Sequence, residues 1–201
     1  MLHTLGLRGN RLTSKSITVI LENISNRSLR HLDLSDNDMR GGAVESLCAV
    51  LRHPNSRLSS LELTSAQLVA GDIKKLCESL MVHETSWLLD WSLSHNHLSP
   101  KAVDYIADFL KYSGCSLNWF DLSWNSFDLK AGEQLAGALA VNKTLSSINL
   151  AANALRDEGG QHIAACLLGN QTLREIFLSL NNIGGKTCFI FSKVTYIYIS
   201  C

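Results

Sequence analysis

The sequence lacks the features that mark linkers, membrane spans and strongly charged binding proteins. Only two of its 201 residues are proline, and no run of glycine, serine or charged residues interrupts it, which argues against a second domain. Its 18 basic and 18 acidic residues balance, so bulk charge favours neither nucleic acid nor a membrane as partner. We find no secretory signal and no apolar run of roughly 18 residues, the length that a spanning helix needs.

The spacing of the cysteines argues against disulfide and metal chemistry. No CxxC pair and no zinc-like Cys/His spacing occurs, so we expect reduced thiols and neither a disulfide framework nor a metal site. Reduced thiols and the missing signal predict a cytoplasmic location, with the nucleus as the other option. The six cysteines are Cys48, Cys77, Cys115, Cys166, Cys188 and Cys201.

What the chain does contain is an internal repeat. Seven segments read close to LxxLxLxxNxL and begin 27 to 30 residues apart, at Leu2, Leu29, Leu58, Leu88, Leu117, Leu145 and Leu173. The third apolar position is always leucine, at Leu7, Leu34, Leu63, Leu93, Leu122, Leu150 and Leu178. Self-similarity at such a period indicates a solenoid built from one supersecondary unit.

Each segment begins with a short strand, because its apolar residues alternate with polar ones at period two. The second and third apolar positions must therefore point into one core, and successive strands form one parallel sheet. An asparagine recurs where the chain turns inward, and its amide can satisfy backbone groups that no ladder reaches. The asparagines are Asn10, Asn37, Asn96, Asn125, Asn153 and Asn181, and Ala66 stands at the remaining position.

The second part of each repeat has helical spacing. Apolar residues recur at four positions per repeat, for example at Leu47, as in a helix with one buried face. Cys48 and Cys77 occupy a slot that later repeats fill with alanine, so we expect both to be core residues. Asn142 and Asn170 stand where a helix ends and a strand begins, and we expect them to stop the helix in the left-handed conformation.

A strand followed by a helix at a period of roughly 28 residues builds a right-handed β-α superhelix of horseshoe shape, with a parallel concave sheet and convex helices. This pattern resembles the leucine-rich repeats of the ribonuclease-inhibitor-like subclass. Residues 45–63 resemble repeats of NOD-like receptors and of ribonuclease inhibitor, and residues 155–173 resemble the shorter repeats of intracellular scaffold and Ran GTPase-activating proteins. The resemblance implies an α/β leucine-rich repeat solenoid.

We expect one leucine-rich repeat domain over residues 1–183 and a divergent tail over residues 184–201. The tail has β-branched and aromatic residues where a helix favours Ala, Leu and Glu. No polar cap precedes Leu2, so the first repeat has an uncovered face. We therefore expect residues 1–28 and 184–201 to exchange their backbone amides faster than the middle repeats.

No set of residues suggests catalysis, a metal or a cofactor. The polar residues recur at repeat offsets instead of converging on one pocket. His95 and His97 flank Asn96, but the neighbouring repeats supply no zinc ligand at the matching positions. The run GGKT at residues 184–187 lacks the earlier glycine of a phosphate-binding loop. We therefore expect no enzyme activity and no cofactor.

The candidate binding surface is the concave wall. Side chains between the buried leucines must point out of it, because successive residues of a strand alternate faces. These positions hold several acids and no Lys or Arg, while lysines fall on or beside the helices. Large exposed aromatics are enriched at interfaces. We expect a partner to be bound by Asp33, Glu62, Asp90, Trp119, Asp121, Trp124 and Glu175.

The sequence therefore favours a non-enzymatic protein-interaction module, part of an intracellular scaffold or receptor, that binds a protein partner with a basic surface. It implies no nucleic acid, membrane or small-molecule substrate. Two alternatives stay open. A GTPase-activating regulator of the Ran type would carry a strongly acidic tail, which is absent, and a ribonuclease inhibitor would be markedly acidic, whereas this chain is neutral.

We predict that Leu34, Leu63, Leu93, Leu122 and Leu150 form one buried row. Leu93→Ala should then lower the free energy of unfolding by about 2 to 5 kcal/mol, as truncation of a buried leucine does. Denaturant melts of the two proteins measure this change. A loss under about 0.5 kcal/mol, typical of a surface site, would contradict the repeat alignment.

Overall fold

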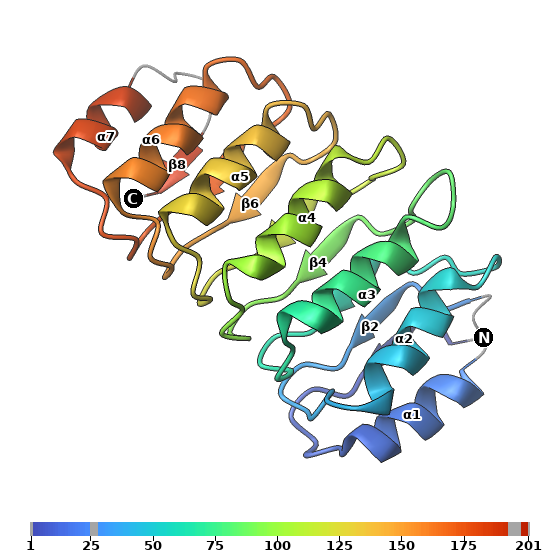
Figure 1. The fold of residues 1–201 in the computed structure, drawn as a ribbon. Coiled ribbons are helices and arrows are strands. Elements are labelled where there is room, and N and C mark those ends of the chain that lie inside the picture. The colour runs from blue at the N-terminus through green and yellow to red at the C-terminus, as the bar shows by residue number, and fades with distance from the viewer. Residues whose placement is uncertain (1, 25–27, 193–197, 201) are drawn as a thin grey trace.

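The protein is an α/β solenoid in which strands and helices alternate along the chain (Figure 1). The structure is a computed structural model and describes residues 2–24, 28–192 and 198–200. The strands are β1 Thr4–Gly6, β2 His31–Asp33, β3 Ser60–Glu62, β4 Asp90–Ser92, β5 Trp119–Asp121, β6 Ser147–Asn149, β7 Glu175–Phe177 and β8 Tyr198–Ser200. The helices are α1 Ser14–Asn23, α2 Gly42–Arg52, α3 Ala70–Leu80, α4 Lys101–Lys111, α5 Leu129–Leu139, α6 Arg156–Leu167 and α7 Gly185–Phe191.

The strands form one parallel sheet in chain order from β1 to β8. They pair in register, so that Leu32 lies opposite Leu61 and Leu61 lies opposite Trp91. Helices α1 to α7 lie in a row along one side of this sheet (Figure 1). This arrangement confirms the predicted leucine-rich repeat solenoid. None of the described helices has the length and apolar character needed to cross a bilayer.

The core lies between the sheet and the helices. The predicted row of leucines is buried, with 0% exposure at Leu34, Leu63, Leu93, Leu122 and Leu150. In the first repeat, Leu5 and Leu7 are only partly buried, which agrees with the uncovered face expected there. Strand β1 has a neighbouring strand on one side only, so these two leucines pack against half as many repeats as their equivalents.

Aromatic rings replace leucine in the core of the middle repeats. The Trp91 and Phe120 rings stack with centroids 5.2 Å apart, and Phe109 meets the Trp91 ring edge-on at 6.0 Å. The Nε1 of Trp91 is buried without a hydrogen-bond partner among the described residues, which costs about 1 to 3 kcal/mol. The large apolar area of the three rings offsets this cost.

The thiols are packed as the sequence predicts. Cys48 and Cys77 are each 1% exposed, in the layer between the helices and the sheet. Burial raises the pKa of both thiols above the ordinary cysteine value, which makes them unreactive at neutral pH. All five cysteines of the described part of the chain are free thiols, and Cys201 lies outside it.

The asparagine amides tie each turn to the repeat before it. The Asn96 Nδ2 donates to the Leu93 carbonyl in its own repeat, at 3.0 Å, and to the Leu63 carbonyl in the preceding repeat, at 2.8 Å. Its Oδ1 accepts from the backbone N–H of Ala66 at 2.9 Å and of Leu68 at 3.1 Å. Bonds to the preceding repeat are also made by Asn37, Asn125, Asn153 and Asn181. The structural role predicted for this ladder is confirmed.

The turns that hold the asparagines have an unusual backbone. The residue before each ladder position has a φ between 51° and 68°, at Gly9, Asp36, Ser65, His95, Trp124, Ala152 and Leu180. Residues with a Cβ adopt this left-handed conformation at a cost, so the turn is held by its hydrogen bonds. At Ala66 the amide is missing, and the Met39 N–H bonds instead to the Ala66 carbonyl at 3.3 Å.

Asn142 and Asn170 also have a structural role, but by another route than the one predicted. Neither has a positive φ, so the expected left-handed helix stop is wrong. Instead, the Asn142 Nδ2 donates to the Leu110 carbonyl at 2.8 Å, and its Oδ1 accepts from the Leu145 N–H at 2.8 Å. Asn170 makes the equivalent bonds one repeat later. These buried amides close the turn from helix to strand.

The segment from residue 184 onward has more regular structure than the sequence predicts. Helix α7 begins at Gly185, and strand β8 pairs with β7. The expectation that the residues of this tail disfavour a helix is wrong for residues 185–191, because Thr187 and Phe191 bury one face of α7. The Thr187 hydroxyl also donates to Asp157 Oδ1 on α6 at 2.7 Å. Tertiary contacts thus override weak helix propensity here, while the domain boundary at residue 183 stays a prediction.

The ladder makes a sharp prediction about stability. Asn96→Ala should lower the free energy of unfolding by more than about 2 kcal/mol, because it leaves several buried backbone groups unsatisfied. Asn10→Ala is the matched control, since the Asn10 amide is exposed and bonds only to carbonyls of its own turn. It should change stability by under about 0.5 kcal/mol. Equal losses in urea melts would contradict the inter-repeat role of the ladder.

Candidate functional site

The side of the sheet away from the helices carries two rows of side chains, which we call the open sheet face. They are the first and third residues of each strand, since the middle residue points into the core. The first row is Thr4, His31, Ser60, Asp90, Trp119, Ser147, Glu175 and Tyr198, and the second is Gly6, Asp33, Glu62, Ser92, Asp121, Asn149 and Phe177. The strand register places members of a row side by side.

The residues predicted to bind a partner lie on this face or at its border. Half-buried strand positions hold Asp33, Glu62, Asp90, Trp119 and Asp121. Glu175 is exposed on β7, and Trp124 is 50% exposed in the turn after β5. The structure spreads these side chains over five of the parallel strands and the turn after β5, so they form a broad surface and not a pocket.

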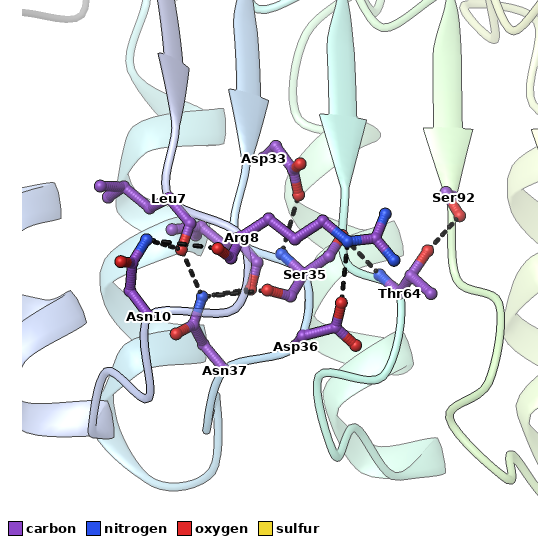
Figure 2. A network of polar contacts seen from close by, with 10 residues as sticks. Leu7, Arg8, Asn10, Asp33, Ser35, Asp36, Asn37, Thr64 and Ser92 are labelled. Atoms are coloured by element: carbon purple, nitrogen blue, oxygen red, sulfur yellow. Dashed lines mark hydrogen bonds and ion pairs between the residues drawn. The ribbon is translucent and has the colours of Figure 1, made fainter.

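Carboxylates crowd the first half of the open sheet face. Asp33 and Glu62 are direct partners in the register of β2 and β3. Partial burial, followed by the charge of Asp33, raises the pKa of Glu62, and the Arg8 charge opposes this shift. Figure 2 shows Arg8 reaching across the turns, where its Nε donates to Asp36 Oδ2 at 2.8 Å. Arg8 therefore brings one positive charge to a face that the sequence predicts to be without basic residues on its strands.

Some of these polar side chains also hold the turns that follow the strands. Asp33 Oδ1 accepts from the Ser35 N–H and Asp121 Oδ1 accepts from the Ser123 N–H, both at 2.9 Å. In the same way, Asn149 Oδ1 accepts from the Ala151 N–H at 3.0 Å. The predicted binding role of Asp33 and Asp121 did not include this one, although their equal spacing after each strand is visible in the repeat. One oxygen of each carboxylate is thus engaged in the fold.

The second half of the open sheet face is aromatic. Trp119 is half-buried on β5, and the rings of Phe177 and Tyr198 meet at 6.0 Å. Between Trp119 and Glu175, in the same row, lies Ser147, which is 6% exposed. Its Oγ has no hydrogen-bond partner within the described part of the chain, a feature that the sequence did not reveal.

The border of the face holds a second aromatic contact. The Trp124 ring stacks on the His95 ring, with centroids 4.8 Å apart and planes 12° apart. Both residues occupy the left-handed turn position of successive repeats, so the fold itself sets them side by side. The sequence pattern indicates Trp124 but not this stack, which limits the movement of the tryptophan.

The charges are distributed as predicted in one respect. Lys74 and Lys75 lie on α3, Lys101 and Lys111 on α4, and Lys130 on α5. All therefore lie on the helical side of the solenoid (Figure 1). On the opposite side, burial raises the pKa of Asp90, and the nearby His31 charge lowers it. The helices also hold acids, nine against nine basic residues, so the helical side is balanced in charge, whereas the described strand positions of the open sheet face hold acids and no Lys or Arg.

Known proteins share this repeat. A family model described as "Leucine Rich repeat" matches residues 25–48, 141–164 and 169–186. NACHT, LRR and PYD domains-containing protein 14 of Homo sapiens is 32% identical over 155 residues, which cover 77% of this chain and 14% of that protein. NACHT, LRR and PYD domains-containing protein 12 of Homo sapiens is 34% identical over 157 residues, or 78% of this chain and 15% of that protein.

The chain therefore spans about one seventh of the length of these curated relatives. Among solved structures, the C-terminal domain of tropomodulin from Caenorhabditis elegans has a TM-score of 0.64 at 15% identity. That match covers 75% of this chain and 90% of the other. It is a likeness of fold alone.

The crowded carboxylates predict a pH effect on stability. Because the folded-state pKa of Glu62 is raised, its ionised form destabilises the native state above that pKa, and the penalty disappears as the pH falls through it. Glu62→Gln should therefore be more stable than the wild type at neutral pH and lose this advantage in acid. Urea melts at both pH values test this, with the exposed Glu133→Gln on α5 as control. A variant less stable than wild type at neutral pH would contradict it.

Proposed function

This chain is a leucine-rich repeat protein whose repeats resemble those of NOD-like receptors, and from that premise we propose that it is a non-enzymatic module that binds a protein partner on its open sheet face. The binding residues of this proposal are Asp33, Glu62, Asp90, Trp119, Asp121, Trp124 and Glu175. Leucine-rich repeats present an extended concave surface to their partners. The seven side chains lie on or beside such a surface.

The observation that carries the proposal is the position of Trp119. Its ring stands half-buried in the middle of the open sheet face, with Asp90 and Ser147 as its register partners. Tryptophan is strongly enriched among residues that contribute most to protein interfaces, near their centres. The carboxylates around it form the polar surroundings that such a centre has.

The partner in this proposal has a basic surface. None of the described strand positions of the open sheet face holds Lys or Arg, whereas several carboxylates do lie there. Complementary charge speeds association and suppresses wrong partners. The raised pKa values of Glu62 and Asp90 support the same conclusion, because a basic partner would stabilise the two crowded carboxylates in their ionised form.

We place the module in a larger intracellular scaffold or receptor, in the cytoplasm or the nucleus. The free thiols of the described cysteines support a reducing compartment, and the share of the relatives that the chain spans supports a larger protein. We also assign it to the ribonuclease-inhibitor-like subclass. A full α-helix in the first six repeats and the period of 27 to 30 residues support this assignment.

The test is affinity capture of partners by the wild type and by the variant Trp119→Ala/Glu175→Lys, followed by titration with the recovered partner. The variant changes Glu175 and not Asp121, because the Asp121 carboxylate also accepts a hydrogen bond that holds the turn after β5, and its loss could disturb the fold. The variant should bind at least about tenfold more weakly, as loss of an interface centre requires. Glu133→Lys on α5 makes the same charge change on the helical side and should bind normally. A partner that binds the double variant and the wild type equally would refute the proposed face.

A further inference from the structure

A hollow of about 560 Å³ lies at the edge of the sheet where the strands begin, away from the asparagine turns. The residues that line it precede strands β2 to β5, and they include Arg30, Arg57, Ser59, Trp87, Leu89 and Ser116. None of them belongs to the open sheet face. The hollow is therefore a separate surface, which the proposed function does not use.

The floor of this hollow is apolar and exposed. Trp87 is 53% exposed and Leu89 is 44% exposed, although both stand one residue away from the buried Leu88. The two large apolar side chains of this repeat thus line the same hollow and are exposed to water. Exposed apolar area of this kind, with polar residues at its rim, is typical of an interaction site.

Two arginines stand at the rim. The Arg57 guanidinium lies over the Trp87 ring, 4.4 Å from its centroid, and one of its amino groups donates to the Ser56 carbonyl at 2.8 Å. The group is therefore held in place before any ligand arrives. In the described part of the chain, neither Arg57 nor Arg30 forms an ion pair with a carboxylate. Both guanidinium groups can therefore pair with a carboxylate of a ligand.

We propose that this hollow docks an acidic segment of a protein partner. A carboxylate of the segment pairs with the guanidinium groups of Arg57 and Arg30, and an adjacent apolar side chain packs on Trp87 and Leu89. Arg binds carboxylates with two parallel hydrogen bonds, and a guanidinium already stacked on a ring loses little freedom on binding. The chemistry is opposite to that of the open sheet face, whose carboxylates would repel such a segment.

Nucleic acid is a weaker candidate for this hollow. Tight binding to a nucleic acid backbone requires many phosphate contacts from Lys and Arg, and two arginines line this hollow in a chain of zero net charge. Stacking on Trp87 alone would give little affinity. An acidic peptide needs only one or two basic partners and a place for its apolar side chain, which this hollow offers.

The test uses a phage-displayed library of random peptides, panned on the whole chain, with the selected peptides then synthesised and titrated. We expect peptides in which Asp or Glu stands next to a large apolar residue. Their affinity should fall at least about tenfold in Arg57→Glu, in Arg30→Glu and in Trp87→Ser, and it should weaken as salt is added. Thermal melts verify that each variant folds.

Lys101→Glu on α4 makes the same charge change outside the hollow and should bind these peptides as the wild type does. Trp119→Ala should also bind them normally, which separates this proposal from the function of the open sheet face. The proposal is overturned if no peptide is enriched, or if the enriched peptides are basic. It is also overturned if they bind folded Arg57→Glu and Arg30→Glu without loss, or if a single-stranded oligonucleotide displaces them.

Discussion

The structure depends on the side-chain amides that link five of its repeats to the repeat before. An asparagine such as Asn96 gives hydrogen bonds to backbone groups of two successive repeats, and it is buried while doing so. A repeat alone would leave those groups without partners in an apolar interior, at a cost of about 1 to 3 kcal/mol for each. The repeats therefore stabilise one another in sequence, as nearest neighbours in a solenoid do.

The same constraint positions the surface on which the proposed function rests. The residue before each ladder position takes a left-handed backbone whatever its type, even before Ala66, where the amide is missing. His95 and Trp124 meet as a stacked pair for this reason. The parallel register likewise sets Asp33 beside Glu62, although the two carboxylates repel each other. The exposed side chains are thus free to vary in chemistry while their spacing stays constant.

Two surfaces of different chemistry result from one repeated unit. The open sheet face combines carboxylates with Trp119, and the edge where the strands begin combines Arg57 with Trp87. Each surface collects residues from consecutive repeats about 28 to 30 positions apart, since equivalent positions lie side by side in a solenoid. One protein can in this way present an acidic and a basic surface without any net charge.

The sequence by itself determined the repeat, the buried leucine row and the asparagine ladder, because periods of two and 3.6 residues and the hydrogen-bonding capacity of an amide are local properties. It also located Trp119 correctly on a strand. The tertiary structure alone decided the burial of Ser147, the stack of Trp87 under Arg57 and the formation of α7. These depend on contacts between neighbouring repeats, where packing and electrostatic energies outweigh the propensity of any single residue.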